Sequence, residues 1–253
     1  MRTTAVLNLK GGVAKTTTVV NMAAILARLH KKRVLVIDAD SQANTTEFFG
    51  GVPAAACTLS DMLRRTDINN PIHSSNFRGI DLLGADDSLM DLDLSKVEGK
   101  QVDVACLKTK LEQLRGEYDY VFIDCPPAFN AASAAALLAA DDVLIPIKVD
   151  AFSLRGMANL MRQIRNMQAI NKGLKLAGLL PTMFNAKSDN VADALQQLRK
   201  TKLHIFSPIR RSDKADDMTF EQAPLIICSP RSGPCRDYKT LVLEYMRGGA
   251  ING

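Results

Sequence analysis

The sequence lacks the residues and segments on which several classes of protein depend. It contains five cysteines, but no Cys-x-x-Cys pair and no histidine at the spacing of a zinc ligand, so we expect reduced, structural thiols. Its three histidines, His30, His73 and His204, are not placed for catalysis. No run of eighteen or more uncharged apolar residues occurs, which argues against a membrane-spanning helix. The N-terminus enters an apolar segment without the charge and cleavage pattern of a signal peptide, so we expect a cytoplasmic protein.

The composition is typical of a globular chain. Of the 253 residues, 47% are hydrophobic and 23% are charged, which is enough to bury a sizeable core. The apolar residues are spread evenly along the chain, so we expect residues 1–253 to form a single domain. The formal net charge of +5 suits an acidic partner such as nucleic acid, although many basic proteins bind none.

Apolar runs rich in Val, Ile or Leu alternate along the chain with stretches of helical spacing. This alternation predicts an α/β fold, a mostly parallel twisted sheet with helices on both faces. The expected strands are Thr4–Leu9, Arg33–Asp38, Tyr120–Asp124 and Asp142–Val149, and the expected helices are Thr16–His30, Val102–Arg115, Asn130–Ala140 and Phe152–Asn171.

The alternation continues less regularly in the rest of the chain. The segment 48–93 contains Pro53, Pro71 and several glycines, and we expect an excursion there with two short helices and a strand over Gly79–Leu83. The later segments that continue the alternation are Leu174–Met183, Asn190–Lys200, Leu203–Ile209 and Tyr238–Met246.

A glycine-rich turn follows the first expected strand and precedes the first expected helix. Residues 10–18 read KGGVAKTTT. Glycines let backbone N–H groups curl around phosphate oxygens, the helix N-terminus adds positive potential, Lys15 neutralises charge and the Thr16 hydroxyl can ligate Mg²⁺. The sequence therefore predicts a nucleotide phosphate site, although a strict P-loop pattern requires glycines where Leu9 and Ala14 stand.

Three motifs follow one another along the chain: KGGVAKTTT at residues 10–18, VLVIDADSQANTT at residues 34–46 and VFIDCPP at residues 121–127. They resemble those of the ParA/MinD family of deviant Walker A P-loop ATPases, and of its ParA/Soj-type partition ATPases in particular. KGGVAKTTT is similar to the family's KGGxGKTT box. VLVIDADSQANTT at residues 34–46 is similar to its switch I motif, and VFIDCPP at residues 121–127 is similar to its Walker B and switch II segment. The likeness extends more weakly along most of the chain and is least in residues 48–93.

The resemblance implies ATP and Mg²⁺ as cofactors and assigns roles to the loop. Lys15 and the backbone of Gly11, Gly12, Val13 and Ala14 would hold the β- and γ-phosphates, Thr16 would bind Mg²⁺, and Thr17 would lie near the α-phosphate. Lys10 is the family's signature lysine, which crosses a dimer interface to the ATP of the other subunit. A methyl group at Ala14 narrows the turn if the residue has positive φ and is tolerated if φ is negative. We expect nucleotide binding to survive this substitution.

Three acidic residues follow the ends of buried strands. Asp38 and Asp40 are expected at the carboxyl edge of the sheet, facing the phosphates. By resemblance, Asp40 orients the attacking water, Asp38 supports the metal or the switch, and Asp124 is the Walker B carboxylate that holds Mg²⁺ through water. Gln42 and Asn44 are further switch I candidates. Positioning and charge neutralisation suffice for phosphoryl transfer, so catalysis is expected to rest on Lys10, Lys15 and Asp40.

The base pocket and the DNA surface are expected in later segments. The family's base pocket lies in late loops, which here places it at Met183, Asn185, Arg211 and Ser212, with a preference for adenine that only the resemblance implies. Basic residues cluster at Arg199, Lys200, Lys202 and Arg210, and contacts of such residues with phosphates need no base sequence. A solvated basic face is the alternative interpretation.

The resemblance implies a switch with weak ATPase activity. Two subunits would close around two ATP molecules, bind DNA non-specifically on the nucleoid and be released by slow hydrolysis that a ParB-like partner stimulates. The cargo would be a plasmid, a chromosome or a mobile element. Because the glycine-rich loop begins at residue 10, we expect no preceding helix-turn-helix and no operator binding.

Other functions on the same fold stay open at this point. A MinD-like membrane or protein-positioning switch would end in a basic amphipathic helix, whereas this chain ends RGGAING. An iron-protein reductase would need cysteines at a subunit interface to hold an iron–sulfur cluster, and the sequences around Cys106 and Cys125 do not match those of such cysteines. A metabolic ATP-dependent synthetase is disfavoured by Lys10, and a tyrosine kinase by the lack of a C-terminal tyrosine cluster.

Overall fold

The computed structural model describes residues 1–64, 71–92, 102–149, 151–185, 194–196, 198–199 and 202–248, with the backbone alone for residues 151–156. It contains a seven-stranded sheet in the order β3-β4-β2-β5-β1-β6-β7. Every pairing is parallel except that of β3 with β4. The expected α/β class is therefore confirmed, whereas a single domain over residues 1–253 stays a prediction. In the described residues, no helix is both long enough and apolar enough to cross a membrane.

The strands are built from the buried apolar runs of the sequence. β2 (Val34–Asp38), β5 (Tyr120–Asp124), β6 (Asp142–Lys148) and β7 (Lys175–Thr182) agree closely with the expected ranges. β1 covers Arg2–Val6 rather than Thr4–Leu9. Its start is held by an ion pair of 2.7 Å between Arg2 and Asp142, and beyond its end the side chain of Asn8 accepts a hydrogen bond from the Lys10 N–H and turns the chain.

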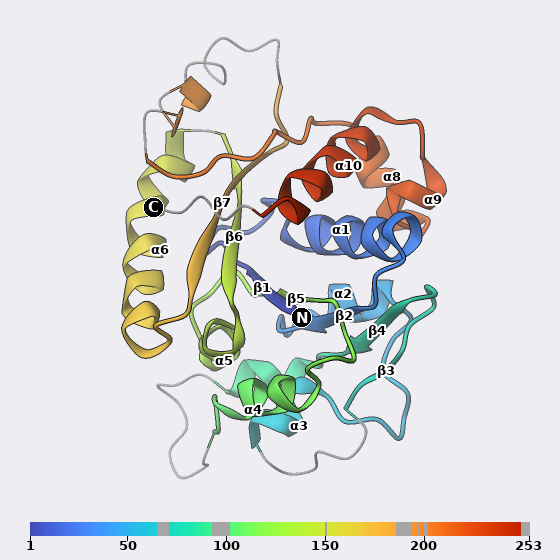
Figure 1. The fold of residues 1–253 in the computed structure, drawn as a ribbon, viewed down its shortest axis with the longest axis vertical. Coiled ribbons are helices and arrows are strands. Elements are labelled where there is room, and N and C mark those ends of the chain that lie inside the picture. The colour runs from blue at the N-terminus through green and yellow to red at the C-terminus, as the bar shows by residue number, and fades with distance from the viewer. Residues whose placement is uncertain are drawn as a thin grey trace.

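Two layers of helices cover the two faces of the sheet (Figure 1). One layer packs on the side chains of Val6, Val36 and Phe122 and contains α1 (Lys15–His30), α2 (Asn44–Phe48), α8 (Lys214–Phe220), α9 (Leu225–Cys228) and α10 (Gly233–Met246). The other contains α3 (Leu59–Arg64), α4 (Cys106–Gln113), α5 (Ala131–Ala139) and α6 (Ala151–Ile170). Burial on both faces explains why the central strands are continuously apolar.

The irregular segment expected at residues 48–93 contains the strands at one edge of the sheet. It contributes α3, β3 (His73–Ser74), β4 (Ile80–Leu83) and the 3₁₀ helix Asp87–Asp91. The expected strand and two short helical pieces are present, but the antiparallel strand β3 was not predicted, because two residues carry no detectable period.

Two later segments differ from expectation. α10 begins five residues before Tyr238, because Ser232 caps it by accepting a hydrogen bond from the Cys235 N–H and Pro234 occupies its first turn. Residues 203–209 form no strand in the described structure, although the Leu179 N–H donates to the His204 carbonyl and the Phe206 N–H to the Leu179 carbonyl beside β7. The expected helix Asn190–Lys200 lies largely outside the described residues.

Candidate functional site

The glycine-rich loop connects β1 to the N-terminus of α1. Gly11 and Gly12 are exposed, Gly12 has φ +65°, and a Cβ atom built at either position would meet nothing within 4 Å. Lys15, Thr16 and Thr17 form the first turn of α1, where the N–H groups have no partner within the helix. The loop thus presents backbone donors and a helix N-terminus to the same space, as a phosphate site requires.

Ala14 is the N-cap residue of α1 and has φ 66° and ψ 36°. This is the left-handed region, in which the Cβ atom of an L-residue is crowded. Of the two possibilities that the sequence left open for Ala14, the structure has the strained one. The loop therefore keeps the glycine-like backbone in spite of the methyl group.

Two side-chain hydrogen bonds fix the loop against the sheet. The Asn8 amide donates to the Pro146 carbonyl at 2.7 Å, and Thr182 at the end of β7 donates to the Val13 carbonyl at 3.1 Å. The Lys15 ammonium donates to the Lys10 carbonyl at 3.4 Å and so lies over the loop. The two lysines that the sequence singles out are thereby brought to the same turn.

Asp38 and Asp124 lie side by side at the carboxyl edge of the sheet. They are paired in the register of β2 and β5, and both are buried. The Asp38 carboxylate accepts hydrogen bonds from the N–H of Asp40 at 3.1 Å and from the N–H and hydroxyl of Thr46 at 2.8 Å. Asp38 thus connects the end of β2 to the start of α2.

Asp124 connects the glycine-rich loop to α2. Its Oδ2 atom accepts hydrogen bonds from the hydroxyls of Thr16 and Thr45, each at 2.6 Å. Its Oδ1 atom is buried and meets no donor in the described part of the chain. A buried carboxylate oxygen without a partner, beside a threonine hydroxyl at a helix N-terminus, fits a hard cation such as Mg²⁺.

Burial raises the pKa of both carboxyl groups. For Asp38 the value rises to about 7, because burial disfavours the charged form and the charge of Asp124 adds to the effect. For Asp124 it rises to about 6, again chiefly through burial, while the hydroxyls of Thr16 and Thr45 oppose the rise. Two adjacent buried acids thus favour a shared cation or a shared proton.

Asp40 follows the strand and is partly exposed at the site. Its Oδ1 atom accepts a hydrogen bond of 3.1 Å from the Gln42 N–H, and its carbonyl accepts one of 2.9 Å from the Ala43 N–H. These bonds form a tight turn that leads into α2 at Asn44. Gln42 and Asn44 are both exposed on this turn.

The four residues expected around the base are brought together by backbone hydrogen bonds. The Phe184 N–H donates to the Ile209 carbonyl at 2.9 Å, and the Arg211 N–H donates to the Phe184 carbonyl at 3.0 Å. Met183 and Asn185 therefore lie beside Arg211 and Ser212. Because Thr182 contacts the Val13 carbonyl, this group adjoins the glycine-rich loop.

The expected DNA-binding residues have different surroundings. Arg199 and Lys202 are exposed, and Lys200 lies outside the described residues. The Nε and Nη2 atoms of Arg210 both donate to the Asp237 carboxylate at 2.7 Å. This bidentate ion pair occupies the edge of the guanidinium that a phosphate would otherwise use.

Roles for Thr45, Thr46 and Thr182 at the site, and for the side-chain amide of Asn8, were not predicted from the sequence. Thr45 and Thr46 stand inside the motif of residues 34–46, and their position at the start of a helix was the available signal. Thr182 had no local signal, because its partner Val13 is distant in the chain. The five cysteines are free, and the described residues contain no group of three His, Cys, Asp or Glu side chains that could hold a metal.

Comparisons with known proteins place the chain in a family. A family model described as an AAA domain matches residues 1–176. The chain is 31% identical over 251 residues to the sporulation initiation inhibitor protein Soj of Bacillus subtilis, covering 97% of this chain and 98% of that protein. It is 31% identical over 245 residues to the chromosome partitioning protein ParA of Myxococcus xanthus, covering 95% and 86%.

A solved structure shares the fold of this chain. Cobyrinic acid a,c-diamide synthase from Mycobacterium smegmatis, with a bound ATP analogue and magnesium, is 29% identical. The match covers 98% of this chain and 95% of that chain, with a TM-score of 0.81. The loop, the paired aspartates and the full-length similarity agree, and the chain therefore belongs to the ParA family of P-loop partition ATPases.

Proposed function

We propose that the chain is an ATP-gated dimerising switch that binds duplex DNA without sequence preference and segregates a plasmid, a chromosome or a mobile element. The observation that carries this proposal is the convergence of Lys10, Lys15, Thr16 and Asp124 at one edge of the sheet. The phosphate loop is joined by hydrogen bonds to the end of β5 through Asp124 and to the end of β7 through Thr182. The state of a bound nucleotide can therefore alter the backbone around the loop.

The chain's own residues would bind and position ATP. Lys15 and the backbone of residues 11–17 would hold the phosphates, and Thr16 and Asp124, supported by Asp38, would hold Mg²⁺. When bound, Mg²⁺ neutralises charge on the phosphate oxygens. Asp40 would orient the attacking water, and Met183, Asn185, Arg211 and Ser212 would surround the adenine.

The switch would act through the segment that follows Asp38. Thr45 and Thr46 attach the start of α2 to Asp124 and Asp38, so a change at either carboxylate reaches this segment directly. Lys10 would cross to the ATP of a second subunit. The resulting dimer would bring two basic surfaces together, and a ParB-like protein would stimulate the slow hydrolysis that separates them.

Arg199 and Lys202 are the residues that we propose for DNA contact, together with Lys200. The exposure of Arg199 and Lys202 leaves their charged groups accessible to phosphates. Arg210 is held by Asp237, so we propose that it supports this surface rather than contacting DNA itself. Binding to the nucleoid would follow from such sequence-independent contacts.

A metabolic synthetase is the second candidate. It is favoured by the likeness to cobyrinic acid a,c-diamide synthase, and it would consume ATP without any effect of DNA. A MinD-like positioning switch would respond to lipid vesicles in place of DNA.

The test is fluorescence anisotropy of an arbitrary labelled duplex with no nucleotide, with ADP and with ATP, each with Mg²⁺ and at two salt concentrations. We expect ATP-dependent binding that weakens with salt and is reduced at least about fivefold by Arg199→Ala with Lys202→Ala. The matched control is Lys172→Ala with Lys175→Ala, two exposed lysines elsewhere. ATP-independent or salt-insensitive binding would contradict the proposal.

A further inference from the structure

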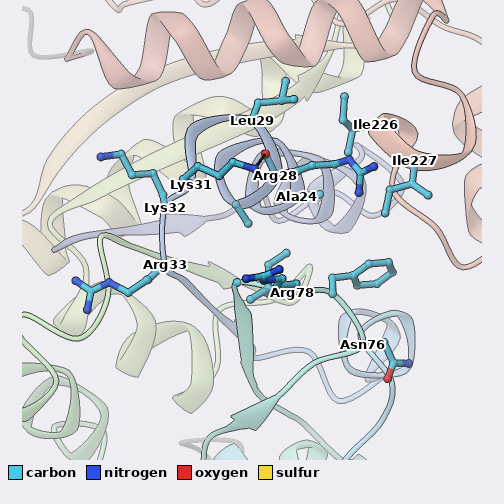
Figure 2. Close-up of a pocket in the computed structure, with 14 residues that line it drawn as sticks. Ala24, Arg28, Leu29, Lys31, Lys32, Arg33, Asn76, Arg78, Ile226 and Ile227 are labelled. Atoms are coloured by element: carbon cyan, nitrogen blue, oxygen red, sulfur yellow. Dashed lines mark hydrogen bonds between the residues drawn. The ribbon is translucent and has the colours of Figure 1, made fainter.

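A concavity of about 810 Å³ lies at the end of α1 that is remote from the glycine-rich loop. It is enclosed by the last turn of α1 and the residues that follow it, by the turn between β3 and β4, and by α9 (Figure 2). Lys15 and Arg28 are thirteen residues apart on α1, so the concavity lies roughly 20 Å from the phosphate loop. Its volume is within the range of sites that bind ligands or peptide side chains.

The charged side chains that line this pocket all have one sign. Of the described residues that line it, none is Asp or Glu and five are basic: Arg28, Lys31, Lys32, Arg33 and Arg78. Arg33 donates to the Gly116 carbonyl at 2.9 Å and lies 3.8 Å from Asp119. Within the described ranges, no carboxylate forms an ion pair with Arg28, Lys32 or Arg78. The pocket therefore concentrates positive potential that an anionic group would neutralise.

The walls of the same pocket are apolar. Leu29 on α1 is 48% exposed and Ile227 at α9 is 41% exposed, and both line the pocket with Phe77. Figure 2 shows Leu29 and Ile227 on the α1 and α9 sides, with Arg78 on the facing turn. Phosphate groups of a duplex would leave this apolar surface in water, whereas a peptide that carries both carboxylate and apolar side chains would cover both kinds of surface.

The walls of the pocket are held in place by local structure. The ring of Phe77 packs on Phe48 and Phe49, with centroids 6.0 and 5.7 Å away. The Ile80 N–H donates to the Phe77 carbonyl, and the Val34 N–H donates to the Gly79 carbonyl, so the turn that carries Arg78 is bound to β2. A preformed surface loses little conformational freedom when a partner binds.

We propose that this pocket is a docking site for an acidic segment with apolar side chains, contributed by a partner protein. The segment would place carboxylates against Arg28 and Arg78 and apolar side chains against Leu29 and Ile227. Because the pocket lies at the far end of α1, docking leaves the phosphate loop accessible. The inference does not depend on DNA binding.

The test is selection of a displayed library of random dodecapeptides on the full chain, followed by anisotropy of the selected synthetic peptides. We expect acidic peptides with apolar residues whose affinity falls at least tenfold in Arg28→Glu/Arg78→Glu and at higher salt. Ile227→Ser should weaken them at least threefold. The matched control, Lys172→Glu/Lys175→Glu, makes the same change in net charge and should bind as the wild type does.

Unfolding curves and basal ATP turnover of each variant report whether the chain remains folded, since the substituted side chains are exposed. The proposal is overturned if no peptide is selected, if the selected peptides lack acidic residues, or if they bind the charge-reversed variant equally well. It is also overturned if Ile227→Ser has no effect, or if charge reversal weakens only the binding of duplex DNA. In the last case the basic residues belong to a DNA surface.

Discussion

The Thr16 hydroxyl and Asp124 Oδ2 lie 2.6 Å apart, which joins the start of α1 to the end of β5. The two residues come from motifs separated by more than a hundred positions. Thr45 donates to the same oxygen, so one carboxylate organises the phosphate loop and the segment after β2. A nucleotide bound at the phosphate loop would therefore influence the segment after β2 through this oxygen.

Removing the Thr16 hydroxyl tests its role in holding Mg²⁺. We expect Thr16→Ala to weaken Mg²⁺-dependent ATP binding at least about tenfold, because a hard ligand beside Asp124 is lost. Thr16→Ser keeps the hydroxyl and should retain most of the affinity. Isothermal titration with and without Mg²⁺ measures both variants, and wild-type affinity in Thr16→Ala would contradict the assignment.

Ala14→Gly relieves a strained backbone at the loop. We expect an increase in the free energy of unfolding of about 0.5–1 kcal/mol, since left-handed backbone costs alanine more than glycine. Gln222→Gly is the matched control, because Gln222 is exposed, has φ 45° and lies outside the loop.

Only Ala14→Gly should also raise the affinity for ATP, because its lost methyl group belongs to the turn that would enclose the phosphates. Denaturant titration and nucleotide binding separate the two effects. Equal affinity changes in the two variants, or weaker binding by Ala14→Gly, would show that the methyl group does not restrict the site.

The paired acids predict a pH dependence of the nucleotide-free protein. The pKa of Asp38 is about 7 in the folded chain, above the ordinary value of about 3.9 that applies in the unfolded chain. Between these values the folded state binds more protons, so the contribution to stability is present at low pH and is lost as pH rises from about 4 to about 7.

We expect Asp38→Asn to remove much of this loss, which is on the order of a few kcal/mol. The measurement is the free energy of unfolding of both proteins at pH 5.5 and pH 8 without nucleotide. A pH dependence that is the same in wild type and variant would show that Asp38 is ionised in the folded chain throughout this range.

Variants of the ion pair between Arg210 and Asp237 test whether Arg210 supports the proposed DNA-binding surface or contacts DNA itself. If Arg210 supports the surface, Asp237→Ala and Arg210→Ala should weaken DNA binding by similar factors, and the double variant should add little. If Arg210 contacts phosphate itself, Asp237→Ala frees the guanidinium and strengthens binding. Anisotropy of a labelled duplex with ATP and Mg²⁺ separates these results.

The sequence predicted the elements whose signals are local. Continuous apolar runs identified β2, β5 and β6, and the glycine turn with Lys15 and Thr16 located the start of α1. The φ angle of Ala14 was left open by the sequence, because positive φ is uncommon for alanine, whereas the family's motif has at this position a glycine, which adopts either sign. The bonds of Thr182 to Val13 and of Arg210 to Asp237 join distant segments and leave no local pattern. The two-residue strand β3 is too short to show a period.

The most direct test of the account is light scattering combined with binding to an arbitrary duplex in the same samples. The conditions are no nucleotide, ADP and ATP with Mg²⁺ for the wild type, and ATP with Mg²⁺ for Lys10→Ala. The account predicts a dimer and salt-sensitive DNA binding with ATP alone, and loss of both in Lys10→Ala. A dimer that ignores DNA, or DNA binding by a monomer without ATP, would contradict it.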